Sequence, residues 1–118
     1  MAVKNVRITK RHATLTYKGE KLSARIKIRP TKTVAQKSHT KREIYIDPLL
    51  AKNRNMFKAA AVHELIEGRN QKRGLPQQRA HRIACHEEDK YWYKNKMGNI
   101  KQYARKVDQI WRKRNKSR

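Results

Sequence analysis

Cysteine is nearly absent from this sequence of 118 residues, which contains Cys85 and no second cysteine. A disulfide within the chain is therefore excluded, and we expect neither dependence on an oxidising compartment nor a disulfide-linked partner. No apolar run approaches the roughly 18–20 residues of a membrane-spanning helix, and the first residues lack the apolar stretch of a signal peptide. We therefore expect an intracellular, cytoplasmic protein that does not enter a membrane.

Several catalytic and recognition motifs are also missing. There is no glycine-rich phosphate loop, no CxxC pair and no serine-centred hydrolase motif, so nucleotide hydrolysis, thiol redox chemistry and acyl transfer find no support. Helix-turn-helix, zinc-finger and aromatic ribonucleoprotein motifs are not recognisable either. Their absence argues against a sequence-specific reader of duplex DNA or RNA.

Negative charge is scarce and unevenly placed. Nine Asp and Glu residues stand against 32 Lys and Arg residues, which gives a formal net charge of +23. Residues 1–42 carry 13 basic and 1 acidic residue, residues 43–92 carry 9 and 7, and residues 93–118 carry 10 and 1. The basic flanks predict a polyanionic partner, and nucleic acid bound through phosphate contacts and counterion release is the first expectation.

The apolar residues that are present follow two different periods. Apolar and polar residues alternate in three runs between positions 6 and 28 and again at 44–46, as in strands with one apolar face. Between them, residues 31–41 are rich in Thr, Lys and Ser and are predicted to form an exposed loop. From position 56 onwards the spacing is helical, and an apolar stripe from Ile100 to Trp111 is the clearest example.

These periods predict an α+β fold. We expect one domain over residues 1–118, with a small, mainly antiparallel sheet and loop at 3–47, a helical pair at 55–97, and a basic amphipathic helix and tail at 99–118. Asn55 is the expected cap of the first helix, and Pro76 is expected to open the second.

Four of the nine acidic residues lie in two stretches that contain histidine. In the stretch that begins His63-Glu64, His63 and Glu67 are four positions apart and share one face of the first long helix. His81 and Glu88 are seven apart and share a face of the second. His63, Glu67 and His81 therefore form a candidate metal site, with Glu88 as a substitute ligand or a supporting partner.

The segment His63-Glu64-x-x-Glu67 resembles the zincin metallopeptidase motif, in which two histidines four apart hold zinc and the intervening glutamate activates water. Residues 43–88 as a whole resemble a compact zincin-like domain. The resemblance implies zinc as a cofactor and Glu64 as the catalytic base if the protein is an enzyme. Glu67 stands where the family has its second histidine, so the site is expected to be either metal-stabilised or vestigial.

A purely structural alternative is open for the same residues. The carboxylates of the centre could pair with neighbouring cations and form a polar seam between two antiparallel helices; the residues concerned are Glu64, Glu67, Glu87, Glu88 and Asp89 with Arg69, Arg79, Arg82 and Lys90. Cys85 is expected to pack in the core and not to act as a nucleophile. Its neighbour His86 points about 100° away from it on a helix, so the two side chains do not face each other. Trp92 is expected to pack against Trp111.

Three basic zones and two tyrosines are predicted to contact nucleic acid through phosphate binding and base stacking. They are Lys10, Arg25, Lys27 and Arg29 on the strands; Lys32, Lys37, Lys41 and Arg42 in the loop; Tyr91 and Tyr93; and Arg105, Arg112, Lys113, Arg114, Lys116 and Arg118 at the C-terminal end.

In size, charge, basic loop and basic helical tail, the chain resembles a small ribosomal protein. The resemblance implies a structural component of the ribosome that binds ribosomal RNA beside neighbouring ribosomal proteins, with RNA favoured over DNA. Two alternatives are open. One is a compact zincin-type metallohydrolase tethered to nucleic acid by its flanks, and the other is a chromatin or virion protein that coats DNA.

Overall fold

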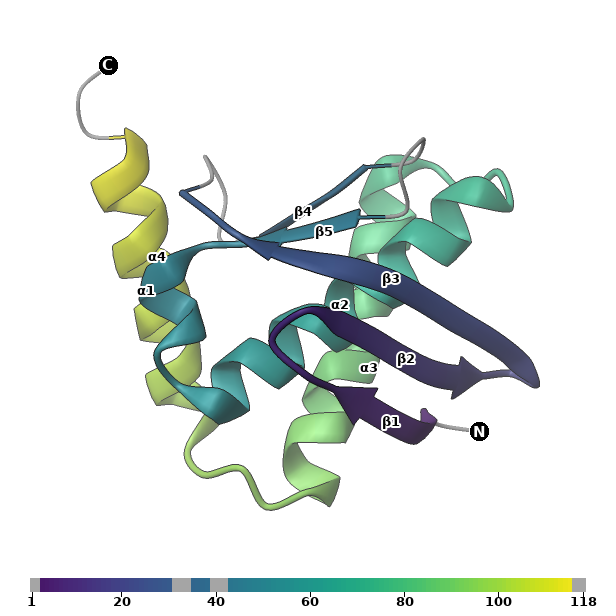
Figure 1. Ribbon diagram of the computed structural model, residues 1–118, viewed down its shortest axis with the longest axis horizontal. Helices are drawn as coiled ribbons and strands as arrows, with labels where there is room; N and C mark the ends of the chain where they lie inside the picture. The colour runs from purple at the N-terminus through teal and green to yellow at the C-terminus, as the bar shows by residue number, and fades with distance from the viewer. Residues whose placement is uncertain (1–2, 31–34, 39–42, 116–118) are drawn as a thin grey trace.

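The protein is built from a five-stranded sheet and four helices, in the computed structural model that describes residues 3–30, 35–38 and 43–115 (Figure 1). The strands are β1 (Lys4–Ile8), β2 (His12–Tyr17), β3 (Glu20–Ile28), β4 (Ala35–Ser38) and β5 (Glu43–Ile46). The helices are α1 (Pro48–Ala51), α2 (Arg54–Lys72), α3 (Gln77–Lys94) and α4 (Ile100–Asn115). The α+β class is as predicted, and no helix in the described part is long and apolar enough to cross a membrane.

The sheet is mixed, with strand order β1-β2-β3-β5-β4. β3 and β5 run parallel, and the other neighbouring strands pair antiparallel. β2 and β3 are joined by a tight turn in which Lys18 and Gly19 have φ values of 51° and 77°. Positive φ at both central residues is what a two-residue type I′ turn requires, and such a turn matches the twist of the two strands.

One segment predicted as loop is a strand. Residues 35–38 form β4, with Ala35 opposite Ile46 and Ser38 opposite Glu43 of β5. Backbone N–H and C=O groups pair with a neighbouring strand whatever side chains they carry, so β4 needs no apolar alternation of its own. The rest of the predicted loop, residues 31–34 and 39–42, lies outside the described residues.

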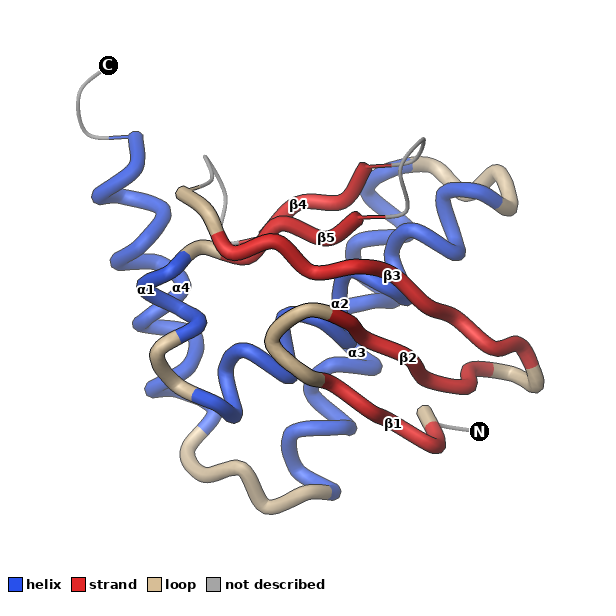
Figure 2. The backbone as a smooth tube through the Cα atoms, viewed as in Figure 1, coloured by secondary structure: helices blue, strands red, loops and turns tan. Residues whose placement is uncertain are grey.

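The core lies between the sheet and α2. Alternate residues of β2, β3 and β5 are buried, and the buried positions are Ala13, Leu15, Tyr17, Ala24, Ile26, Ile44 and Ile46. Facing them, α2 is buried at Phe57 and from Ala59 to Ile66. Each fully buried aliphatic side chain of this kind contributes about 1.5–3 kcal/mol to folding. The tube view shows the strands as one layer with α2 and α3 behind them and α4 to one side (Figure 2).

The helix boundaries follow local capping. The Oδ1 atom of Asn53 accepts a hydrogen bond of 3.0 Å from the Met56 amide, so Asn53 caps α2 in place of the predicted Asn55. Asn55 instead donates from its side chain to the Met97 carbonyl at 3.3 Å. Pro76 directly precedes α3, as predicted.

α4 packs against the rest of the protein through two buried side chains, Tyr103 and Ile110. The Tyr103 ring stacks on Trp92, with ring centroids 4.8 Å apart and an interplanar angle of 7°. Trp92 thus stacks on Tyr103, and Trp111, its expected partner, is 51% exposed. The Trp92 indole also donates to the Gly98 carbonyl at 2.8 Å, which fixes the turn before α4.

Candidate functional site

The predicted metal ligands come together between α2 and α3. His63, Glu64 and Glu67 lie within about one turn of α2. His81, Cys85 and Glu88 lie on successive turns of α3. Residues four apart on a helix lie one above the other, so the His63/Glu67 and His81/Cys85 pairs each present two polar groups to the neighbouring helix.

Glu67 is the carboxylate on which the two histidines meet. Its Oε1 atom lies 2.8 Å from His63 Nε2 and 2.9 Å from His81 Nδ1. Its Oε2 atom accepts a hydrogen bond of 3.0 Å from the Gln77 side chain. Burial alone would raise the pKa of Glu67, but the hydrogen bonds from His63 and His81 outweigh it and lower the pKa to about 2.

His63 is held from both ring nitrogens. Its Nδ1 atom lies 2.9 Å from Glu88 Oε1, and the other oxygen of Glu88 accepts a hydrogen bond from the Tyr103 hydroxyl. His63, Glu88 and Tyr103 are all buried. Burial would lower the pKa of His63, but hydrogen bonds with Cys85, Glu67 and Glu88 together raise it well above its ordinary value.

Two residues of this cluster were missed at the level of sequence. Cys85 was assigned to the core, yet it is only half-buried and its Sγ atom lies 3.5 Å from His81 Nε2. The four-residue spacing between His81 and Cys85 could have found it, because that spacing is the one used for His63 and Glu67. Tyr103 has no such signal, since it reaches the cluster from a different helix.

Two sets of three side chains in the cluster could hold a metal ion. One set is His63, His81 and Cys85, and the other is His63, Glu64 and Glu67; in each, the ligand atoms lie within 4.8 Å of one another. His63 belongs to both sets. Glu64 places its Oε2 atom 3.7 Å from His63 Nε2, on the nitrogen opposite the one bound by Glu88.

The predicted polar seam of arginines and carboxylates has a different composition in the structure. Arg69 reaches Glu20 at 3.0 Å, which makes its assignment to the acidic cluster wrong. Glu87 accepts a hydrogen bond of 3.1 Å from Tyr17, and burial together with the charge of Glu87 and this hydrogen bond raises the pKa of Tyr17 to about 12. Histidines and tyrosines therefore bind Glu67, Glu87 and Glu88.

The sheet face opposite α2 is cationic. The exposed lysines and arginines on this side are Lys4, Arg7, Lys21, Arg25, Lys27 and Arg29, which we name the basic sheet face. Of these, Lys4, Arg7 and Lys21 were not singled out in the sequence. Lys4 and Lys21 both pair with Thr16 across neighbouring strands, so the register places them on one face.

Part of the basic sheet face is engaged within the protein. Glu43 lies 3.9 Å from Arg25 and 3.4 Å from Lys27, whose side chains remain 69% and 58% exposed. The Arg29 guanidinium lies 3.8 Å from the centre of the Tyr45 ring. The two cations are therefore exposed while their shared partner Glu43 is buried.

The other predicted nucleic-acid contacts are spread over the molecule. Lys10 is exposed in the turn between β1 and β2, and Lys37 lies in β4 opposite Ile44. On α4, Arg105 and Lys113 are exposed, and Arg112 pairs with Asp108 at 3.0 Å; Arg114 also belongs to α4. Lys32, Lys41, Arg42, Lys116 and Arg118 fall outside the described residues.

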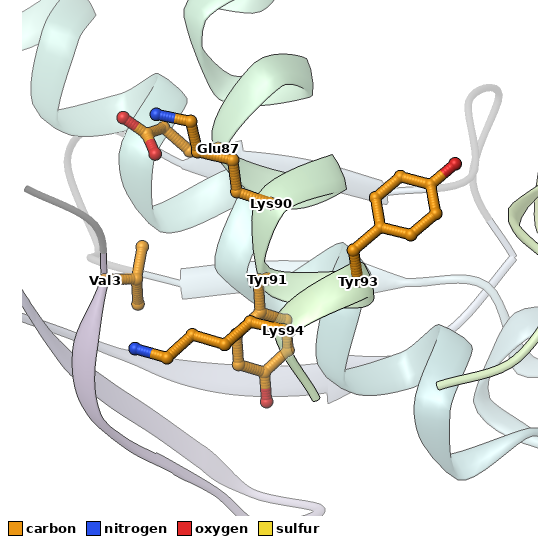
Figure 3. Close-up of a pocket in the computed structure, with 6 residues that line it drawn as sticks. All are labelled: Val3, Glu87, Lys90, Tyr91, Tyr93 and Lys94. Atoms are coloured by element: carbon orange, nitrogen blue, oxygen red, sulfur yellow. The ribbon is translucent and has the colours of Figure 1, made fainter. Parts of the chain in front are cut away.

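A surface pocket of about 390 Å³ lies between the start of β1 and α3. It is lined by Val3, Glu87, Lys90, Tyr91, Tyr93 and Lys94 (Figure 3). Tyr91 is half-buried, whereas Tyr93 is 63% exposed and its ring points away from Val3. The two tyrosines predicted to stack on bases therefore border one pocket together with two lysines.

Comparison of the chain with models of protein families, with curated proteins and with solved structures finds no match.

Proposed function

We propose that this protein is a zinc-dependent hydrolase on a zincin-like scaffold, with its centre between α2 and α3. The observation that carries the proposal is the position of Glu64, whose carboxylate lies 3.7 Å from Nε2 of His63, a member of a set with His81 and Cys85 that could hold a metal ion. This is the relation between ligand and base that the zincin motif implies. A short strand, β5, also precedes the helix that bears the motif.

The donor atoms at the centre suit zinc. Imidazole nitrogen, thiolate sulfur and carboxylate oxygen are the ligands that zinc takes in proteins, and catalytic zinc sites use three of them. The buried support from Glu88 and Tyr103 is typical of metal-binding histidines, whose second nitrogen is bound by a carboxylate. When bound, zinc would supply a water of lowered pKa and polarise a carbonyl oxygen.

The chain's own contribution to hydrolysis would be proton transfer. Glu64 is 8% exposed and stands beside His63, so its carboxylate can accept a proton from a water at the centre and return it to the leaving amine. His81 has a side chain that is 58% exposed, which leaves the centre open to solvent and to substrate on that side.

The test is Glu64→Gln, assayed as zinc content and as hydrolysis of fluorophore-labelled casein. We expect the variant to keep stoichiometric zinc and to lose at least about 100-fold in rate, the usual contribution of a general base. Glu87→Gln is the matched control, because Glu87 is also buried but binds Tyr17. A wild-type protein that binds no zinc, or a Glu64→Gln variant as active as the wild type, would contradict the proposal.

A second candidate function is RNA binding, and the basic sheet face is the observation that favours it. Its six exposed cations lie on the sheet side away from α2, where a phosphate backbone could run across several strands. The pocket beside Tyr91 and Tyr93, flanked by Lys90 and Lys94, suits an unpaired base stacked on an aromatic ring. In this function the metal centre would serve stability rather than catalysis.

RNA binding is tested by comparing two triple variants of equal charge. Replacing Lys4, Arg7 and Lys21 by alanine removes cations from the basic sheet face, whereas replacing Lys52, Arg54 and Lys58 removes as many cations from the end of α1 and the start of α2. With a ribosomal RNA fragment, we expect the first variant alone to reduce the slope of log affinity against log salt by about 2–3. Equal effects of the two variants would contradict a specific basic face.

A structural role in the ribosome is tested in cells. Native lysate would be sedimented through a high-salt sucrose cushion, and the subunit fractions analysed for this chain by mass spectrometry. Stoichiometric presence would support a ribosomal component. Absence from the subunits, with duplex DNA bound at least as tightly as structured RNA, would favour the DNA-coating alternative.

A further inference from the structure

The two histidines of the centre share a feature that the zincin resemblance does not account for. Glu88 lies 2.9 Å from Nδ1 of His63, and Glu67 lies 2.9 Å from Nδ1 of His81. A carboxylate at Nδ1 favours the tautomer that carries its proton there, which leaves the Nε2 lone pair for a metal. His81 is therefore arranged to bind a metal through Nε2. In His63 the Nε2 atom lies 2.8 Å from Glu67 Oε1, so a metal bound there would take the place of this contact.

Cys85 stands at the Nε2 atom of His81. The distance from Cys85 Sγ to His81 Nε2 is 3.5 Å. Zinc–nitrogen and zinc–sulfur bonds of about 2.0–2.1 and 2.3 Å at a tetrahedral angle place the two ligand atoms about 3.6 Å apart. The separation between Cys85 and His81 is thus that of two ligands of one zinc ion.

The third ligand is within reach of this pair. His63, His81 and Cys85 have ligand atoms within 4.8 Å of one another, and the two imidazole rings meet edge to face with centroids 4.9 Å apart. The thiol is half-buried, so it is sheltered by the two helices without being sealed from the centre.

We propose that zinc is held by His63 Nε2, His81 Nε2 and Cys85 Sγ, with Glu67 and Glu88 orienting the two histidines. The inference rests on the proposed zinc centre and departs from the zincin pattern, in which position 67 would itself be a ligand. Three protein ligands leave the fourth position open. Glu64, 3.7 Å from His63 Nε2, is then the carboxylate beside that open position.

The rival ligand set is His63, Glu67 and His81, because Glu67 Oε1 also lies 2.8 Å from His63 Nε2. The two sets differ in the role of Glu67. As a positioning residue it would be replaceable at the cost of about 10–100-fold in metal affinity, the usual effect of losing a carboxylate behind a histidine ligand. If Glu67 is a ligand, its replacement would reduce the metal affinity by more than this factor, and Cys85 could be replaced without loss of metal binding.

The experiment loads the full chain with cobalt(II) in place of zinc and measures the absorption spectrum and the metal affinity. The variants are Cys85→Ser, Cys85→Ala, Glu67→Gln and Glu88→Gln, each checked for its fold by circular dichroism. Glu88→Gln is the matched control for Glu67→Gln, because Glu88 also binds an Nδ1 atom. The charge-transfer band from thiolate to cobalt in the near ultraviolet reports the bond to Cys85 directly.

The inference expects the thiolate band in the wild type and in Glu67→Gln, and its loss in both Cys85 variants. It also expects Glu67→Gln and Glu88→Gln to weaken metal binding by similar factors, and the Cys85 variants to weaken it further. Bound cobalt without a thiolate band, together with a larger loss in Glu67→Gln, would overturn the inference and leave the proposed hydrolase intact. No stoichiometric metal in the wild type would overturn both.

Discussion

At the scale of single residues, Glu67 joins two helices by one oxygen atom. Its Oε1 contacts imidazoles from α2 and α3 at hydrogen-bond distance, and its pKa is lowered to about 2 by these contacts despite burial, which acts in the opposite direction. In the metal-free protein Glu67 pairs with His63, whose pKa is raised, and the same oxygen contacts His81, whose side chain is 58% exposed.

Glu67 makes the unfolding free energy of the metal-free protein depend on pH in the acidic range. Its folded pKa of about 2 lies below the ordinary 4.5, so its contribution is complete above about pH 4.5 and is lost as the pH falls toward 2. Allowing for the exposure of His81, we expect a loss of about 1–2 kcal/mol in unfolding free energy over this range.

The measurement is urea unfolding at several pH values with a chelator present. Glu67→Gln should be less stable than the wild type at pH 6 and should show a flatter profile below pH 5. His63 does not contribute to the pH dependence below pH 5, because its pKa is raised and the imidazole stays protonated throughout. Parallel pH profiles for the two proteins would show that Glu67 does not carry the effect.

The candidate ligands could be predicted from spacing wherever the relevant neighbours lie on one helix. His63 and Glu67 are such a pair, and the structure brings them together with His81 as expected. The contact between Glu88 and Tyr103 could not be predicted, because it is made only when α4 folds back over α3. Which nitrogen of each imidazole faces which carboxylate is likewise fixed by the crossing of the helices and not by sequence.

At the scale of secondary structure, periodicity predicted the long helices and the strands with one buried face. β4 escaped prediction because its four residues, Ala-Gln-Lys-Ser, have no apolar alternation, and its pairing depends on β5 being beside it. The parallel pairing of β3 with β5 was not predicted either, because it depends on the position of β4. The chain crosses to the sheet edge as β4 and returns antiparallel to it as β5, beside β3.

α4 is predicted to depend on its buried side more than on its helical propensity. Ile110 is 1% exposed, whereas its neighbour Gln109 is exposed, so Ile110→Ala and Gln109→Ala form a matched pair. We expect Ile110→Ala to lower the unfolding free energy by about 2–4 kcal/mol and Gln109→Ala to change it by less than about 0.5 kcal/mol.

Urea unfolding followed by circular dichroism measures both variants. Because α4 is the last helix described, a partial loss of helix signal before the main transition in Ile110→Ala would indicate local unfolding of α4. If both variants unfolded like the wild type, the packing of α4 on the core would be contradicted.

At the scale of the whole molecule, charge and core are separated by the sheet. The apolar side of β2 and β3 faces α2, and the other side carries the basic sheet face, so the cations of these strands lie away from the core in a chain with a net charge of +23. The sequence indicated this separation through alternation. It could not indicate that the cations of β1 would extend the surface formed by β3, because that depends on strand register.

The hydrogen bonds from Tyr103 to Glu88 and from Glu88 to His63 connect the basic helix α4 to the metal centre. If the proposed metal site is occupied and a polyanion is bound to α4, this buried chain of contacts is a route by which one could affect the other. If a polyanion on α4 tightens metal binding by some factor, the metal must tighten polyanion binding by the same factor, since the free energy of the cycle is fixed. In that case, removing the metal would also weaken the binding of the polyanion.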